Sequence, residues 1–165
     1  MNSWAERPSE VANLMNPWFC GLLLRNSAEG YASEIEGGLP FELSFLVLPV
    51  IMHKRTREAL PRGVATSMVA WNSENAAILV GMAERARTMA RPTREAIIVS
   101  SAQGLLAVGP EGALRSAGKP LKLSKYTKET TDEVRECLNR AGFFGRWLAT
   151  GGTPRTVLAL WGLRP

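Results

Sequence analysis

Histidine is almost missing from this chain, which has one, His53, among 165 residues. A serine or cysteine nucleophile would depend on that histidine as its general base, and the G-x-S-x-G elbow that often carries a nucleophilic serine is absent. A lone histidine at the end of an apolar stretch more often satisfies the last carbonyls of a helix than transfers protons. We therefore expect no catalytic residues and no enzymatic activity.

Cysteine is scarce as well. Cys20 and Cys137 are the only two, far apart and each among apolar neighbours, so buried reduced thiols are the favoured interpretation and one long-range disulfide the alternative. No histidine–cysteine cluster has the spacing of metal ligands. The glycines from Gly104 to Gly112 lack the lysine of a P-loop and the preceding strand of a dinucleotide fingerprint. The sequence thus predicts no metal and no cofactor.

Long hydrophobic runs are also absent. The most apolar stretch, from Leu43 to Met52, covers about ten residues, which is too short to span a bilayer. The first residues do not show a basic region followed by an apolar run, as a signal peptide would. We therefore expect a cytoplasmic protein that has no membrane contact.

What is present is an ordinary globular composition with a moderate excess of positive charge. Hydrophobic residues make up 45% of the chain and charged residues 21%, and the net charge is +5. A chain of this length is about one domain with a sizeable core, so we expect residues 1–165 to form a single domain with an N-terminal arm at 1–8. The charge permits contact with nucleic acid or an acidic protein and does not choose between them.

Start and stop signals predict helices over most of the chain. Asn16-Pro17 and Thr153-Pro154 each combine a capping residue with proline at the first helical position. The apolar stretch after Pro40 has helical spacing with a kink at Pro49, and a strand over 43–48 is the alternative. Asn72 is expected to cap a longer helix, and Thr130 or Thr131 the next one. The predicted helices are 9–14, 17–30, 40–52, 64–71, 73–90, 92–103, 131–150 and 154–161.

Residues 92–116 are the most informative stretch. Thr93 can cap a helix, Gly104 can end it in a left-handed conformation, and two short apolar runs then flank the turn Gly109-Pro110-Glu111-Gly112. A helix followed at once by a hairpin is the outline of a winged helix. We therefore predict a mainly α fold with a small β-hairpin, of the α+β class, as a winged-helix-like single domain.

Basic residues lie before and after this unit. In a winged helix that binds DNA, the helix enters the major groove and the wing contacts phosphates. Here the helix lacks the arginine and asparagine side chains that read base edges, so the sequence favours phosphate contact over sequence reading. A merely solvated basic face is the most common role of such charges and stays open. The predicted phosphate contacts are Arg87, Arg91, Arg94, Arg115, Lys119 and Lys122.

Aromatic residues gather near the C-terminus, where core packing and a partner surface are both open interpretations. A helix over 154–161 has about two turns, and one of its sides is apolar. We expect residues 154–165 to be a C-terminal docking segment as well as part of the core. The predicted partner interface is Trp4, Val157, Leu158, Leu160 and Trp161.

One family resemblance is carried by four stretches, NLMNPWFCGLLL, PFELSFLVLPVIMHKRTREALP, AERARTMARPTREAIIVSSAQGLLAV and RAGFFGRWLATGGTPRTVLALWGLRP. They resemble the middle component of bacterial three-component ABC systems, small proteins encoded between an SMC-like ABC ATPase and an effector, a group that includes Lamassu-type antiphage defence. The closing pattern R-W-x-A…G-x-P…ALWG-x-R-P is the most specific part. The resemblance implies an accessory subunit that holds the ATPase and the effector together, and it supplies no catalytic residues.

Two functional hypotheses follow from the sequence. The first is a non-catalytic adaptor that bridges an SMC-like ABC ATPase and an effector as a hetero-oligomer in antiphage defence, with DNA contact through the complex. The alternative is a stand-alone winged-helix DNA-binding regulator, which would need a dimer surface and base-reading side chains. An enzyme built around His53 is the least favoured.

Overall fold

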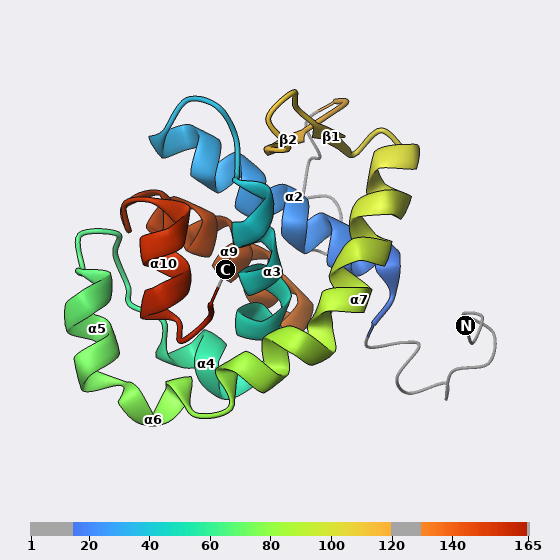
Figure 1. The fold of residues 1–165 in the computed structure, drawn as a ribbon. Helices are drawn as coiled ribbons and strands as arrows, with labels where there is room; N and C mark the ends of the chain where they lie inside the picture. Colours follow the sequence, from blue (N-terminus) through green and yellow to red (C-terminus); the bar gives the residue numbers. More distant parts are fainter. Residues whose placement is uncertain (1–14, 120–129, 165) are drawn as a thin grey trace.

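The computed structural model describes residues 15–119 and 130–164. Helices dominate it (Figure 1), and the β1–β2 hairpin is the one sheet within those ranges. The predicted α+β class, mainly helical with a small hairpin, is confirmed. No helix in the described part of the chain is both long and apolar enough to cross a membrane. The elements are α2 (Pro17–Glu34), α3 (Phe41–Ile51), α4 (Lys54–Ala59), α5 (Met68–Glu74), α6 (Ala76–Leu79), α7 (Met82–Ala102), β1 (Leu106–Val108), β2 (Leu114–Ser116), α9 (Asp132–Ala149) and α10 (Pro154–Leu160).

Helices α2 and α9 form the centre of the fold, and α7 and α3 pack around them (Figure 1). Glycine lets the two central helices approach closely. A Cβ at Gly30 would lie 3.0 Å from the carbonyl carbon of Gly142, and one at Gly145 would lie 2.7 Å from that of Ser27. The Ser27 hydroxyl donates to the Ala141 carbonyl at 2.8 Å, so a buried hydrogen bond joins the helices where they are closest.

Three capping predictions are confirmed. Asn16 caps α2, Thr131 caps α9 and Thr153 caps α10, each by accepting a hydrogen bond from a backbone N–H in the first turn. Helix α2 continues one turn past the predicted end at Gly30. The apolar stretch after Pro40 is the helix α3 with Pro49 inside it, so the alternative strand is wrong. The predicted helix over 9–14 lies outside the described residues.

Helix α7 corrects two predictions. We expected one helix to end near Ala90 and another to begin at Pro92 under a Thr93 cap, but α7 runs through both residues without a break. Proline inside a helix removes one backbone hydrogen bond and costs about 3 kcal/mol. Packing of α7 on both α2 and α3 offsets that cost, and the Thr93 hydroxyl donates back to the Met89 carbonyl at 2.8 Å instead of capping.

The segment before α7 also differs from its prediction. Asn72 lies inside α5 rather than at a cap, and its side-chain amide donates to the Leu160 carbonyl of α10. The expected helix over 73–90 is divided into the end of α5, the short α6 and the start of α7. The break before α7 is at Gly81, whose φ of 76° is left-handed and therefore suits glycine.

The hairpin follows α7 as predicted. Gly104 ends the helix with a φ of 68°, and β1 pairs antiparallel with β2. Leu114 of β2 also pairs with Leu39, since each backbone N–H donates to the other residue's carbonyl, at 2.7 and 2.9 Å. The hairpin is thus attached to the segment that opens α3. Leu106 and Leu114 turn inward and are buried.

An aromatic cluster closes the core at the end away from the hairpin. Trp71, Trp147 and Trp161 lie with ring centroids 5.4 to 6.2 Å apart, and Phe144 meets Trp161 edge to face at 5.5 Å. Two of the indole N–H groups donate to backbone carbonyls, at 2.7 and 2.8 Å. The aromatic residues near the C-terminus are therefore core residues of this chain.

Candidate functional site

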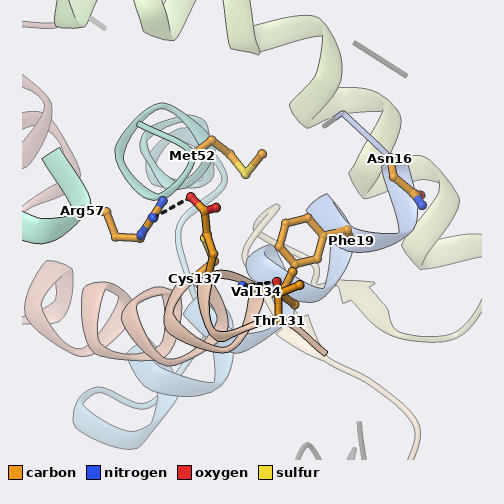
Figure 2. A pocket seen from close by; sticks show the side chains of 8 residues that line it. Asn16, Phe19, Met52, Arg57, Thr131, Val134 and Cys137 are labelled. Carbon is orange, nitrogen blue, oxygen red and sulfur yellow. Dashed lines mark hydrogen bonds and ion pairs between the residues drawn. The ribbon is translucent and has the colours of Figure 1, made fainter. Parts of the chain in front are cut away.

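A pocket of about 390 Å³ lies where the start of α2, the end of α3, α4 and the start of α9 meet (Figure 2). Its lining is mostly apolar, with one ion pair at its edge. The lining residues are Asn16, Phe19, Met52, Arg57, Thr131, Glu133, Val134 and Cys137. Since these come from segments far apart in sequence, only the folded chain forms the pocket.

Arg57 is the buried charged residue at the edge of this pocket, and its side chain is 1% exposed. Its guanidinium donates to the Ile51 carbonyl at 2.8 Å, to Glu133 at 3.2 Å and to Glu136 at 3.5 Å. A buried charge is tolerated only when it is paired and hydrogen-bonded, and both carboxylates are more exposed than the arginine. Arg57 therefore ties α4 to α9 and to the end of α3.

Cys137 supplies the thiol of the pocket. Burial raises the pKa of this thiol, and the neighbouring Arg57 charge opposes that shift less strongly. The thiol therefore stays protonated and is a poor nucleophile at neutral pH. Both Cys137 and Cys20 are free and buried, as predicted. The pocket is suited to holding an apolar group.

His53 has a different role from the one expected. It was predicted to satisfy carbonyls at the end of a helix, but it caps the start of α4, where Nδ1 accepts from the Thr56 backbone N–H at 3.3 Å and lies 2.7 Å from the Thr56 hydroxyl. Burial lowers the pKa of this imidazole, and the positive charges of Arg85 and Arg55 lower it further. Nδ1 must be unprotonated to accept, so the histidine is a neutral cap. In the described ranges, no group of three or more histidine, cysteine or acidic side chains could hold a metal ion.

The predicted phosphate contacts on α7 share one side of that helix, because Arg87, Arg91 and Arg94 are spaced by four and three residues. Carboxylates of the same helix flank them. Arg87 pairs with Glu84, and Arg91 pairs with Glu95 at 3.1 Å. Two of the three positive charges are thus balanced locally, which makes this side less basic than its arginine count indicates.

The other predicted phosphate contacts lie in and after the hairpin. The Arg115 guanidinium donates to the Gly37 carbonyl at 2.8 Å and so holds β2 to the loop before α3. The carbonyl of Lys119 accepts from buried Arg25 at 3.0 Å, while the Lys119 residue itself is exposed. Lys122 lies outside the described residues. That these residues contact phosphate stays a prediction.

The predicted partner interface lies mostly inside the core. Val157 and Trp161 are 0% exposed and Leu158 is 5% exposed, because the apolar side of α10 packs on the aromatic cluster. Leu160 is partly buried against the same core, and Trp4 lies outside the described residues. That the closing segment also contacts a partner stays a prediction, and its main observed contribution is to the core.

A surface that was not predicted from the sequence lies between α3, α7 and the hairpin. We call it the aromatic–arginine surface and define it by Phe41, Phe45, Arg94, Ile98 and Val108. The Phe41 and Phe45 rings meet edge to face at 5.3 Å, and the Arg94 guanidinium lies 5.7 Å from the Phe45 ring centroid. Ile98, one helical turn beyond Arg94, is 68% exposed, Val108 is 52% exposed and Phe41 is 40% exposed.

One sequence signal could have found part of this surface. Ile97 faces the core and is buried, so helical periodicity places its neighbour Ile98 on the outward side with Arg94. An isoleucine on the polar side of a helix breaks the amphipathic pattern. The contact between Arg94 and Phe45 had no such signal, since it joins two helices.

Comparison with known protein families identifies a matching family model. The family model described as ABC-three component (ABC-3C) system Middle Component 3 matches residues 4–165. Searches of curated proteins and of solved structures found no match.

Proposed function

The chain belongs to the Middle Component 3 family of ABC-three component systems, and from that membership we propose that it is a non-catalytic adaptor that bridges an SMC-like ABC ATPase and an effector in a bacterial antiphage defence complex. A middle component of a multi-component system has partner subunits and an accessory role. The match over residues 4–165 carries the proposal, because it covers nearly all of the chain.

The chemistry of the described side chains fits an accessory role. The single histidine is a neutral helix cap with a lowered pKa, and burial raises the pKa of both thiols. The exposed apolar residues of the aromatic–arginine surface are instead typical of contact with another protein. These features support protein binding as the role of this subunit.

Co-purification tests the bridging role. The chain is expressed with the products of its neighbouring genes, with an affinity tag on the ATPase in one preparation and on the effector in the other. We expect the chain to be retained in constant proportion in both preparations, and the ATPase and effector to separate when it is omitted. An ATPase–effector complex of unchanged stability without the chain would contradict the bridging role.

A separate assay addresses catalysis. The purified chain alone is incubated with ATP and with nucleic acid, and we expect no hydrolysis above the buffer rate. Hydrolysis by the parent chain that His53→Ala abolishes would overturn the non-catalytic role, since His53 is the single histidine of the sequence.

A DNA-binding regulator is the second candidate, and the order of a long helix followed directly by a hairpin favours it. Salt dependence separates the candidates. Each phosphate contact contributes roughly 0.9 to the slope of log affinity against log salt, so replacing Arg87, Arg91 and Arg115 by alanine should flatten the slope of the whole complex by about two to three units. An unchanged slope would remove these residues from the DNA contact. Preference of the chain alone for one DNA sequence would favour the regulator.

A further inference from the structure

We propose that the aromatic–arginine surface is a docking site for an amphipathic segment of a partner subunit, one that presents an apolar side chain beside a carboxylate. This inference rests on the proposed function, because it requires that the chain has partner subunits. It adds where one of them binds and what chemistry the bound segment must have.

The surface draws on three elements, α3, α7 and the hairpin. Phe41 and Phe45 lie one turn apart on α3 with their rings in contact, and Arg94 of α7 lies over the second ring. The hairpin borders the same place, because a Cβ at Gly112 in its turn would lie 3.8 Å from Phe41. Val108 pairs with Leu114, so both side chains are on the hairpin face that turns toward the core.

Exposure of these apolar side chains has no explanation within the described chain. Ile98 and Val108 are more than half exposed, although Ile97 beside the first and Leu106, two residues before the second, are buried. Single exposed apolar residues are ordinary, whereas a group that spans a helix, a second helix and a hairpin is typical of a protein interface. A partner with an apolar side chain can cover this group.

Arg94 indicates the charge of the partner. Arg87 and Arg91 pair with carboxylates on α7, but within the described residues Arg94 contacts the Phe45 ring and has no carboxylate partner. The ring restricts the guanidinium and leaves its N–H groups available, and a planar guanidinium binds a carboxylate through two parallel hydrogen bonds. Arginine stacked on an aromatic residue is also the composition found at the energetic centres of protein interfaces. An aspartate or glutamate of the partner is therefore the expected counterpart.

The same observations favour a protein over nucleic acid at this surface. A DNA backbone could accept hydrogen bonds from Arg94, but it offers no apolar side chain to cover Ile98, Val108 and Phe41. A peptide segment satisfies both the arginine and the apolar residues.

The test measures the affinity of the purified chain for each neighbouring gene product, with three variants and one matched control. Ile98→Glu places a charge in the apolar part, Arg94→Ala removes the guanidinium and Arg94→Lys keeps the charge without the planar fork. The control is Val69→Glu, because Val69 is an apolar residue of similar exposure (59%) on α5, at the opposite end of the molecule from the hairpin (Figure 1). All three sites are on exposed helix surfaces, so the four variants should melt within a few degrees of the parent.

For one of the partners we expect Ile98→Glu and Arg94→Ala each to weaken binding by about tenfold or more, which is typical of residues at an interface centre. Arg94→Lys should weaken binding about half as much as Arg94→Ala on a logarithmic scale. Lysine keeps the positive charge but cannot bind a carboxylate through two parallel hydrogen bonds. Val69→Glu should bind like the parent. Replacing the matching carboxylate of the partner should remove any further effect of Arg94→Ala.

Four outcomes would overturn the inference. Parent-like binding of both partners by Ile98→Glu and Arg94→Ala, in a complex that forms normally, would refute the docking site and leave the proposed function intact. Failure of the parent chain to bind either gene product would refute the proposed function itself. A shift from dimer to monomer in Ile98→Glu, with partner binding unchanged, would assign the surface to a second copy of this chain. Weaker DNA binding with unchanged partner affinity would assign it to nucleic acid.

Discussion

Gly145→Ala is a substitution for which the structure reverses the expected sign of the change in stability. In the interior of a helix, alanine is normally more stable than glycine by about 0.5–1 kcal/mol. At Gly145 the new Cβ would overlap the carbonyl oxygen of Ser27 and lie 2.8 Å from its Cα. Both obstacles are backbone atoms of α2, so no rotamer change can move them aside. The central helices must therefore separate.

Separation has a cost that can be approximated. Overpacking of a core costs about 1–3 kcal/mol, and moving α9 away strains two buried hydrogen bonds, Ser27 Oγ to the Ala141 carbonyl at 2.8 Å and Asn26 Nδ2 to the Leu138 carbonyl at 3.1 Å. Loss of a buried hydrogen bond costs about 1–3 kcal/mol. After the gain in helix propensity is subtracted, we expect Gly145→Ala to destabilise by about 3–4 kcal/mol, or about 10 °C in Tm for a chain of this size.

Gly142→Ala is the matched control, because it lies one turn earlier in the same helix. There the new Cβ would lie 3.8 Å from the Asn26 carbonyl oxygen, which is ordinary contact. We expect this variant to be more stable than the parent by up to about 1 kcal/mol. Denaturant unfolding at 25 °C, followed by circular dichroism, measures both changes. Equal stability of the two variants would mean that α2 and α9 are not in contact at Gly145, and the reasoning would fail.

Three other predictions concern the core and the pH dependence of stability. Trp161→Ala should destabilise by about 3–5 kcal/mol, and removal of residues 154–165 should lower the Tm even without partners; a truncated chain that melts like the parent would contradict the burial of Trp161. Because the folded-state pKa of His53 is lowered, the contribution of this histidine to stability is present above its ordinary pKa of 6.5 and is lost as the pH falls below that value. His53→Asn keeps a cap and should reduce the loss of stability between pH 7 and pH 5. A loss equal to that of the parent would refute this. Burial raises the pKa of Cys20 from 9.0 to about 11, so the protonated thiol's contribution to stability is present below pH 9 and should be lost between pH 9 and 11, by up to about 3 kcal/mol; Cys20→Ala should flatten the stability curve there, which denaturant unfolding at each pH would measure.

Local signals were sufficient for many of the elements. Asn16, Thr131 and Thr153 could be recognised as caps because a cap depends on a side chain and an N–H only two or three residues away. Gly104 and the hairpin after it were predictable for the same reason, since a left-handed helix end and a tight turn involve only neighbouring residues.

Contacts between distant segments decided most of what sequence reasoning missed in the candidate site. His53 was placed at a helix end, but its role depended on where α4 starts, and the buried position of Arg57 depended on carboxylates of α9 far along the chain. The partner interface predicted near Trp161 was based on the apolar side of a short helix. Such a pattern cannot distinguish a core from a docking surface, because both bury apolar area.

The sequence by itself determined the helical character of the chain, its capped helix starts, the hairpin and the family, because these depend on residue types at short spacing or on a pattern along the whole chain. Only the tertiary structure decided that α7 continues through Pro92, that Trp161 is core and that Phe45 meets Arg94 on an exposed surface. The physical reason is that each of these features depends on packing by another helix. Such packing decides whether a proline ends a helix, whether an indole is buried and which side chains meet on the surface. Local propensities are worth about 1 kcal/mol or less per residue, and packing between helices is large enough to override them.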